Sequence, residues 1–376
     1  MVQQNTESFT LNKYPSLNGL RAISILLVIL HHLKLQYTVI PGVVLNYFPL
    51  LTDGPFGVNV FFVISGFLIT RLLLNEEHID GKISLKRFYV RRILRIFPAY
   101  YFLLLVYFVL CAYGYMNISG ESWLTSLTYT KYFNWNRDWY TSHAWSLSVE
   151  EHFYIMWPLF FIAGKRVRTC FIFSILLLVP VLRILFNCYP QEWANGLTIF
   201  YRLDAIATGC LFAMYQDKII TLLSPSWKKI FYGCLTALFL LPFINTWNDQ
   251  YHLRLDFFTI PFGGTFSTAA NILIACIMMF SVFGPRGRWF SMLNTGILNR
   301  IGTWSYSLYL WQQLFICRTV YFINRFPFNL LFIFIAAIGS YYLIEKPFLK
   351  LKAKFAVRYE KEIPEKNISP ILELAG

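Results

Sequence analysis

Charge is scarce in this chain. Only 14% of its 376 residues are charged, whereas a soluble domain carries about 25%, and 57% are hydrophobic. This shortage excludes an ordinary soluble enzyme. Negative charge is the scarcer of the two signs, because the chain has 19 Asp and Glu residues against 33 Lys and Arg. The net charge of +14 would suit a nucleic-acid partner, but the basic residues separate by connecting segment, as a membrane topology requires, so we expect no nucleic acid.

Several catalytic and binding motifs are also missing. The chain has no phosphate-binding loop, no GxGxxG fingerprint, no HExxH motif and no Cys–His spacing typical of a metal site. The absence of GxSxG argues against a serine hydrolase of the soluble type. The seven cysteines form no CxxC pair and lie mostly in apolar runs, which favours buried thiols over disulfides or metal ligands. We therefore expect no metal.

Apolar segments that approach the ~20 residues needed to cross a bilayer recur along the chain. The ten expected spans are 22–40, 55–74, 96–115, 150–164, 170–187, 197–215, 230–246, 262–284, 301–322 and 328–345. The sequence thus predicts an all-α fold, a polytopic membrane helix bundle of about ten transmembrane helices. Because no signal-peptide n-region precedes the first apolar run, we expect that run to be retained.

Lys and Arg gather in the connections after even-numbered spans. Residues 82–95 hold six of them, and seven follow the tenth span. The odd-numbered connections hold few, such as Lys131, Arg137 and Arg254. The positive-inside rule then places both termini in the cytoplasm. The expected domains are an integral-membrane unit over residues 1–348 and a basic cytoplasmic tail over residues 349–376, with no appended soluble domain.

Two ionisable residues, Arg21 and His32, stand at either end of the first apolar run. Their spacing of eleven residues puts them on one helix face, about 16 Å apart along the axis. Charge is expensive inside a bilayer, so such residues mark functional sites. The two side chains are too distant to pair, but they could touch opposite ends of one long ligand. His31 is rotated away from this face by about 80°.

The second span combines small and polar residues. Gly54, Gly57 and Gly66 permit close packing between helices. Asn59 and Ser65 lie in apolar surroundings, where they serve either as hydrogen-bonding groups between helices or as substrate contacts. Sequence alone leaves both roles open.

Three arginines, Arg91, Arg92 and Arg95, follow the second span at spacings that share helix faces. Arginine forks match phosphate oxygens, so the cluster could grip a phosphorylated ligand at the cytoplasmic rim. The alternative is a stop-transfer cluster that meets anionic lipid.

Further candidates lie in later spans. Glu150 and Glu151 open the fourth span, either as acids in the first turn of a helix or as carboxylates that orient a histidine or bind a sugar hydroxyl. Arg202 and Asp204, in the sixth span, are expected to pair with each other or with groups on other helices. Tyr309 belongs to a polar stretch of the ninth span that could line a cavity.

Together these segments resemble the acyltransferase 3 family of integral-membrane O-acyltransferases. Seven motifs follow in family order over residues 14–348: GLR-x10-H (19–32), GVNVFFVISGFLIT (57–70), RFYVRRILRIFPAYY (87–101), AWSLSVEEHFYIMWP (144–158), YRLDAIATG (201–209), SYSLYLWQ (305–312) and YYLIEKPF (341–348). The resemblance implies transfer of an acyl group, usually acetyl, from cytosolic acyl-CoA to a hydroxyl. Glycans or glycolipids of the cell envelope are the main acceptors, and small molecules such as macrolides are the alternative. It also implies a multi-pass protein of the bacterial inner membrane.

The resemblance carries roles over to individual residues. The expected catalytic residues are His32, Arg21, Glu150 and Glu151. Arg92 and Arg95, with Arg91, are expected to hold acyl-CoA. The expected substrate contacts are Ser65, Asn59, Arg202, Asp204 and Tyr309. As a hypothesis, His32 is a general base or is itself transiently acylated, and a carboxylate such as Glu150 or Glu151 fixes its tautomer.

Two positions depart from the family pattern. Asn59 stands where members commonly have Asp, which removes a possible carboxylate partner. Gln312 stands where many members have His, which suggests that position 312 is not catalytic or that the acceptor site differs.

Two rival functions fit parts of the sequence. A transporter or flippase for glycolipids or acyl carriers would also need spans with buried Arg, Asp and His, although no inverted repeat is visible. A non-catalytic scaffold would tolerate replacement of Arg21 and His32. Dependence on an acyl donor discriminates the enzyme from both.

Overall fold

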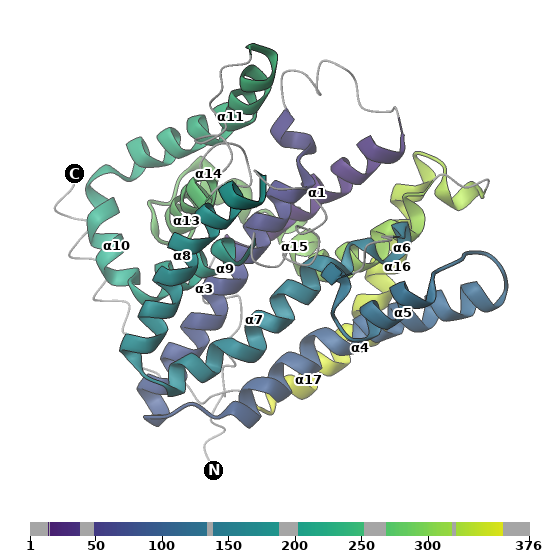
Figure 1. Ribbon diagram of the computed structural model, residues 1–376, viewed down its shortest axis with the longest axis horizontal. Helices are drawn as coiled ribbons and strands as arrows, with labels where there is room; N and C mark the ends of the chain where they lie inside the picture. The colour runs from purple at the N-terminus through teal and green to yellow at the C-terminus, as the bar shows by residue number, and fades with distance from the viewer. Residues whose placement is uncertain are drawn as a thin grey trace.

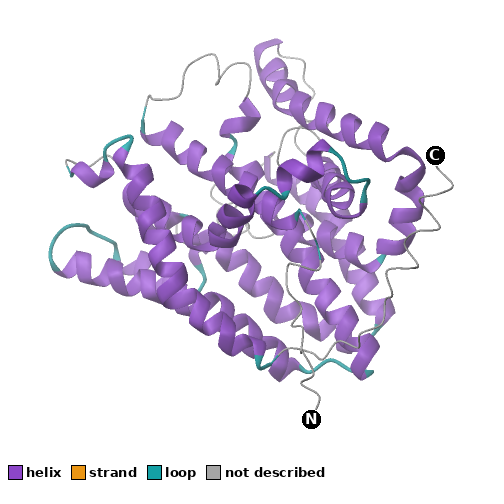
Figure 2. Ribbon diagram, turned by 180° about the vertical axis from the view of Figure 1, so that it is seen from behind, coloured by secondary structure: helices purple, strands orange, loops and turns teal. Residues whose placement is uncertain are grey.

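The computed structural model describes residues 14, 16–37, 49–133, 138–187, 202–251, 268–317 and 321–355. Helices supply the regular secondary structure of these residues, and no strand occurs among them (Figure 2). The predicted all-α fold is therefore confirmed.

The main described helices follow one another in chain order. They are α1 (Leu17–Gln36), α3 (Gly54–Asp80), α4 (Leu85–Ala112), α5 (Gly120–Leu127), α6 (Trp139–Ser142), α7 (Ala144–Ile162), α8 (Lys165–Asn187), α9 (Leu203–Met214), α10 (Gln216–Leu223), α11 (Trp227–Tyr251), α13 (Thr268–Phe283), α14 (Arg288–Leu293), α15 (Gly296–Phe315), α16 (Phe328–Ser340) and α17 (Lys346–Ala353). Between α16 and α17, residues Tyr341–Glu345 form one turn of π-helix. Short 3₁₀ turns occupy Pro49–Thr52, Lys131–Phe133, Ser224–Ser226 and Phe322–Asn324.

Within the described residues, four helices are long and apolar enough to cross a membrane: Leu17–Gln36, Gly54–Asp80, Leu85–Ala112 and Phe328–Lys352. The pair Leu203–Met214 and Gln216–Phe243, bent by 84°, makes a fifth if it is one span. Each of the ten predicted apolar runs overlaps a helix. The number of ten spans and the cytoplasmic placement of both termini stay predictions.

Helix α3 lies at the centre of the bundle, where it packs along α9 on one side and α1 on another (Figure 1). Glycines make the contact with α9 close. A Cβ atom added at Gly66 would lie 2.1 Å from the carbonyl oxygen of Ile206, and one at Gly209 would lie 2.1 Å from that of Val63. Gly57 approaches α1 in the same way. The predicted close packing of the second span is confirmed.

Helix α1 is fixed along α15 by a second close approach. A Cβ atom at Gly302 would lie 1.9 Å from the carbonyl oxygen of Asn18. Because a backbone cannot yield as a flexible side chain can, this contact sets the register between the two helices. Consequently Arg21 and His32 of α1 take fixed positions beside the polar stretch of α15.

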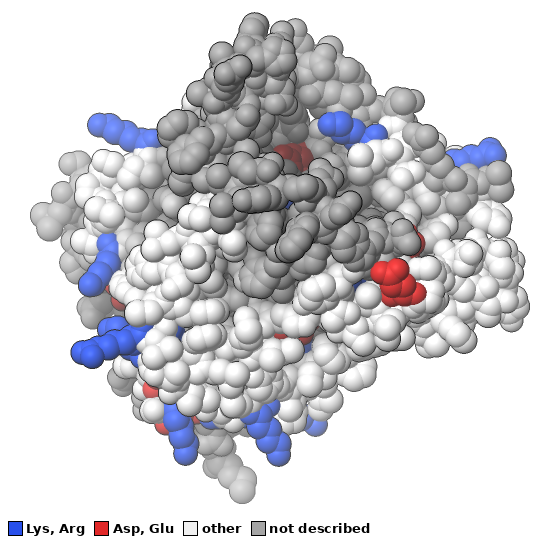
Figure 3. Space-filling model, viewed as in Figure 1, with Lys and Arg blue, Asp and Glu red and all other residues white. Residues whose placement is uncertain are grey.

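Charged side chains are sparse on the described surface. In Figure 3 the Lys and Arg side chains lie mainly around the rim of the face, and the described surface between them is almost free of charge. Large apolar side chains such as Leu105, Phe108, Leu177 and Leu343 are exposed. An uncharged surface with exposed apolar groups is what a bilayer would cover.

Candidate active site

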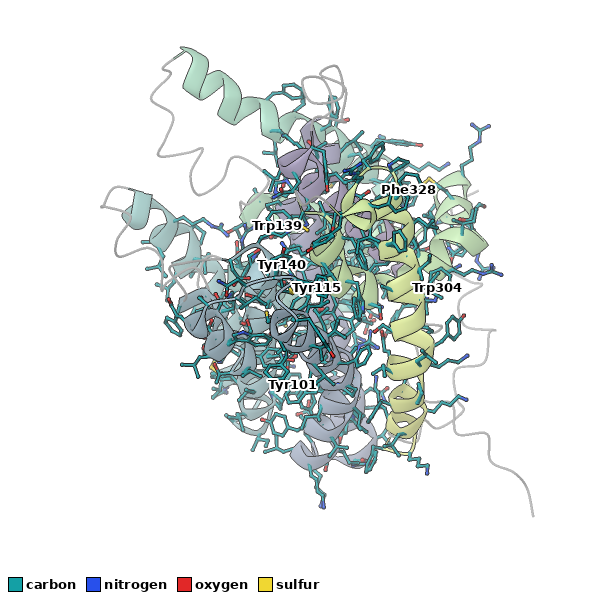
Figure 4. All side chains as sticks on the ribbon, turned by 90° about the vertical axis from the view of Figure 1, so that its right-hand side faces the viewer. Tyr101, Tyr115, Trp139, Tyr140, Trp304 and Phe328 are labelled. Atoms are coloured by element: carbon teal, nitrogen blue, oxygen red, sulfur yellow. The ribbon has the colours of Figure 1, made fainter. Side chains whose placement is uncertain are left out.

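His32 lies in the last turns of α1 and faces α15. Its Nδ1 atom is 3.1 Å from Oε1 of Gln312. The amide nitrogen of Gln312 donates to the carbonyl oxygen of Tyr309 at 3.3 Å, which orients the amide so that Oε1 is the acceptor toward the ring. Nδ1 of His32 therefore donates, and in the neutral imidazole Nε2 carries the lone pair. The indole of Trp139 packs edge-on against the ring, with centroids 5.6 Å apart (labelled in Figure 4).

This contact bears on two expectations. Gln312, the position that departs from the family pattern, lies in hydrogen-bond contact with His32, the predicted catalytic histidine. The partner of Nδ1 is also an uncharged amide, whereas we expected Glu150 or Glu151 to fix the tautomer. The carboxylate of Glu150 instead bonds the hydroxyl of Ser65.

A second histidine is held in the same manner. His143, at the junction of α6 and α7, is only 3% exposed, and its Nδ1 faces Oε1 of Gln313. The same oxygen accepts the backbone N–H of His143 at 3.2 Å. Tyr309 donates its hydroxyl to the carbonyl oxygen of His143 at 2.9 Å and lies 2.6 Å from Oγ of Ser146. Adjacent glutamines of α15 thus hold one histidine each.

Burial determines the charge of His143. Desolvation lowers its pKa to about 4, although the hydrogen bond with Gln313 acts in the opposite direction. The imidazole is therefore neutral at pH 7. Its Nε2 atom has no hydrogen-bond partner among the described residues. The sequence did not indicate a role for His143, because nothing in a one-dimensional pattern links it to Gln313, 170 residues away.

A group of buried charges lies farther along α1, around Arg21. Its guanidinium interacts electrostatically with Arg95 of α4, Glu345 before α17 and Glu150 of α7. Glu345 is buried and accepts a hydrogen bond from Ser307 of α15 at 3.0 Å. Two predicted arginines and one predicted glutamate therefore meet, although they come from three different helices.

The carboxylate side of this cluster is built by α3 and α7. The hydroxyl of Ser65 is hydrogen-bonded to both Glu150 and Tyr154. The guanidinium of Arg92 lies 4.6 Å from the centre of the Tyr154 ring and interacts with Glu151. Oε1 of Glu151 is buried and makes no hydrogen bond with any described residue.

Arg91 lies on another face of α4. Its Nη2 donates to Glu76 of α3 at 2.7 Å, with both side chains buried, and its Nη1 donates to the carbonyl oxygen of Phe355 at 3.1 Å. This ion pair joins α3 to α4. Because its guanidinium is occupied in this way, Arg91 is less available to a phosphate than Arg92 or Arg95.

Two charged residues complete the cluster that the sequence did not single out. Glu345 falls in the YYLIEKPF motif (341–348) and Lys352 in the predicted basic tail (349–376), and neither was expected in the site. In the structure Lys352 interacts electrostatically with Glu345 and with three arginines of α4, Arg91, Arg92 and Arg95. The order of the spans along the chain gave no signal for this contact, because the contact depends on α17 lying along α4 (Figure 1).

The sixth-span residues bind partners on other helices, the second of the two expected arrangements. Arg202, at the start of α9, donates to Oδ1 of Asn59 at 2.9 Å. Asp204 accepts two hydrogen bonds from Arg183 of α8, both at 2.8 Å, and one from Thr268 of α13 at 2.7 Å. These polar contacts tie α3, α8, α9 and α13 together. Asn59, which replaces a common Asp, still serves as an acceptor.

Comparison with known proteins identifies the class. Residues 14–345 match the family described as "Acyltransferase domain", so the chain belongs to this acyltransferase family. It is 29% identical over 388 residues to "Putative O-acetyltransferase SACOL0978" of Staphylococcus aureus (strain COL), covering 92% of this chain and 59% of that protein. No solved structure matches it.

Two further relatives carry more specific names. "Putative peptidoglycan O-acetyltransferase YrhL" of Bacillus subtilis (strain 168) is 28% identical over 79% of this chain and 48% of its own length. "O-acetyltransferase OatA" of Staphylococcus aureus (strain NCTC 8325 / PS 47) is 29% identical over 79% of this chain and 50% of its own. The chain thus spans about half to three-fifths of the length of these relatives.

Proposed function

We propose that this chain is a membrane O-acyltransferase that moves an acyl group, usually acetyl, from cytosolic acyl-CoA to a hydroxyl of a glycan or glycolipid at the bacterial cell envelope. Family membership and the names of the relatives support the class of reaction. The observation that carries the proposal is the His32–Gln312 pair, because it engages Nδ1 of a half-buried imidazole and leaves Nε2 outside this hydrogen bond. We further propose the inner membrane as its location.

In the proposed reaction, Nε2 of His32 takes the proton of the acceptor hydroxyl. The freed oxygen attacks the thioester carbon, the new C–O bond forms, and the C–S bond breaks. The thiolate of CoA leaves and takes the proton from the imidazolium, so the base is regenerated. Throughout, Nδ1–H stays bonded to Gln312, which holds the ring in one orientation without adding charge.

The donor is proposed to lie along α1. Arginine forks suit phosphate oxygens, and Arg92 and Arg95 present two of them beside Arg21. From Arg21 to His32 the helix rises about 16 Å, a length comparable to the pantetheine arm. Arg91 acts through its ion pair with Glu76, which holds α4 in place.

The acceptor is proposed to bind near the two histidines, His32 and His143. Tyr309, between His143 and Ser146, would position its hydroxyl. Glu150 and Ser65 would orient Arg21 and Arg92. Asn59, Arg202 and Asp204 would act through the helices that they join.

Mass analysis of cell-surface glycans tests this proposal. We expect cells that lack the chain, and cells with His32→Ala, to lose the mass of one acetyl group per modified site. Loss of a different mass would identify another acyl group. Movement of an unmodified glycolipid that needs no acyl donor would reject the enzyme in favour of a transporter.

A further inference from the structure

A cavity of about 490 Å³ opens beside the first turn of α1, at the end of that helix opposite His32. Its lining includes Asn18 of α1, Arg300 and Trp304 of α15, and Tyr341, Tyr342 and Lys346 of the α16–α17 segment. In Figure 4 the labelled Trp304 lies beside the yellow C-terminal helix that supplies the last three. The reaction proposed above uses none of these residues.

We propose that this cavity binds the adenosine 3′-phosphate end of the acyl-CoA donor, from which the diphosphate extends toward Arg92 and Arg95. This inference rests on the proposed function and adds a site to it. Aromatic rings, an amide and cations line the cavity. They match the purine face, the exocyclic amine and the phosphate groups of that ligand.

The aromatic and amide groups suit the base. Trp304, Tyr341 and Tyr342 offer ring faces on which a purine can stack. Among the amides of the lining, Asn18 has an Oδ1 atom without a hydrogen-bond partner in the described residues, an acceptor for the exocyclic amine of adenine. The neighbouring amides of Asn294 and Asn299 already bond Ser16 and the backbone.

The cations suit the phosphates. Arg300 and Lys346 both line the cavity and are exposed to solvent, and no Asp or Glu occurs among the described lining residues. The ammonium of Lys346 lies 4.8 Å from the centre of the Tyr342 ring. A cationic and aromatic pocket favours a polyanion with a flat base over a neutral glycan.

The position of the cavity links it to the active site. Asn18 precedes Arg21 by three residues, about one helical turn, so both lie on nearly the same face of α1. Tyr341 interacts electrostatically with Arg95 and Glu345, which belong to the cluster around Arg21. From Asn18 to His32 the helix rises about 21 Å, a span suited to an extended diphosphate and pantetheine arm. The positive-inside pattern also predicts this end to be cytoplasmic, where acyl-CoA is found.

A pair of donors tests the assignment. Full-length protein in phosphatidylcholine nanodiscs would be assayed with acetyl-CoA and with S-acetylpantetheine, which lacks the nucleotide. We expect Arg300→Ala and Lys346→Ala each to raise the KM for acetyl-CoA about tenfold, as loss of one phosphate contact would. The KM for S-acetylpantetheine should change less than twofold. Lys350→Ala, an exposed cation of α17 outside the lining, is the matched control and should resemble the wild type.

Direct binding separates this inference from the proposed reaction. Adenosine 3′,5′-bisphosphate should bind wild-type protein and compete with acetyl-CoA, and binding should weaken about tenfold in the Arg300→Ala variant. If the protein binds the bisphosphate in this way but transfers no acyl group from either donor, the site stands and the proposed function fails.

Three results would overturn the inference. One is transfer from acetyl-CoA whose KM is unchanged in both variants. Another is an equal rise in KM for the two donors. The third is bisphosphate binding that the variants do not alter, with an effect of Arg300→Ala only in nanodiscs that contain phosphatidylglycerol, which would assign the cations to lipid headgroups instead.

Discussion

Nδ1 of His32 lies 3.1 Å from Oε1 of Gln312, although 280 residues separate the two in the chain. The contact gives the glutamine the orienting role that a carboxylate has in a catalytic triad, but without its charge. A neutral partner fixes the tautomer by hydrogen bonding alone. The departure from the family pattern at position 312 therefore lies in direct contact with the proposed catalytic histidine.

Removal of this partner is expected to slow the reaction. In Gln312→Ala the buried Nδ1–H loses its acceptor, which costs about 1–3 kcal/mol, so kcat should fall about tenfold to hundredfold with little change in donor KM. Steady-state acetyl transfer measures this effect. Gln312→Glu keeps an acceptor toward Nδ1–H and should retain more activity than the alanine variant. A Gln312→Ala protein with wild-type kcat would remove Gln312 from the mechanism.

Acid should destabilise the protein through His143. Its pKa in the folded state is about 4, below the ordinary value of 6.5, because burial disfavours the charged form. Between these values the unfolded chain binds the proton first, so stability falls as pH drops from 6.5 toward 4, by up to about 3 kcal/mol. His143→Gln should flatten this part of a Tm-against-pH curve measured in detergent. An unchanged slope would contradict the assignment.

Protonation of Asp138 should destabilise the folded protein at a lower pH than protonation of His143. Burial opposes its ionisation, but hydrogen bonds from Ser122 and Thr141 and the charge of Lys131 hold its pKa below the usual value. A lowered pKa contributes stability above the unfolded-state value of about 3.9, and that stability is lost as pH falls further, through the folded-state value. The loss of stability through Asp138 therefore occurs at lower pH than the loss through His143, which falls between pH 6.5 and 4.

The same carboxylate neutralises a fully buried lysine. Nζ of Lys131 is 0% exposed and lies 3.0 Å from Asp138. Asp138→Asn should therefore cost about 3–5 kcal/mol of unfolding free energy, because it leaves a buried charge without its counter-ion. Denaturant unfolding measures the loss, and Lys131→Met together with Asp138→Asn should recover part of it. Equal stability of the wild type and the single variant would argue against a buried pair.

Close packing between α3 and α9 gives a test of the fold. Gly66→Ala would place Cβ 2.1 Å from the carbonyl oxygen of Ile206, so the helices must separate, at a cost of about 1–3 kcal/mol. Gly233→Ala in α11 is the matched control, because nothing lies within 4 Å of the added atom, and it should be neutral or stabilising by up to about 1 kcal/mol. Thermal unfolding of the two variants compares them. Similar Tm values would contradict the close approach.

The sequence predicted the helices and their order because apolar runs and small residues act locally. Gly66 and Arg21 could be recognised from their own surroundings, one by size and the other by charge in an apolar run. The partner of Gln312 could not be predicted in this way, since periodicity shows which face of a helix is polar but not which helix it meets. The same holds for Glu345 and Lys352, whose contact with the arginines depends on how α17 packs along α4.

Transfer of labelled acetyl from acetyl-CoA by purified protein in nanodiscs, compared between the wild type and His32→Ala, tests the central claim most directly. We expect the wild type to label a glycan or glycolipid acceptor and the variant to lose at least about a thousandfold of the rate, because the base that takes the hydroxyl proton is gone. The variant should keep the wild-type Tm. A folded His32→Ala protein that labels the acceptor at the wild-type rate would contradict the mechanism.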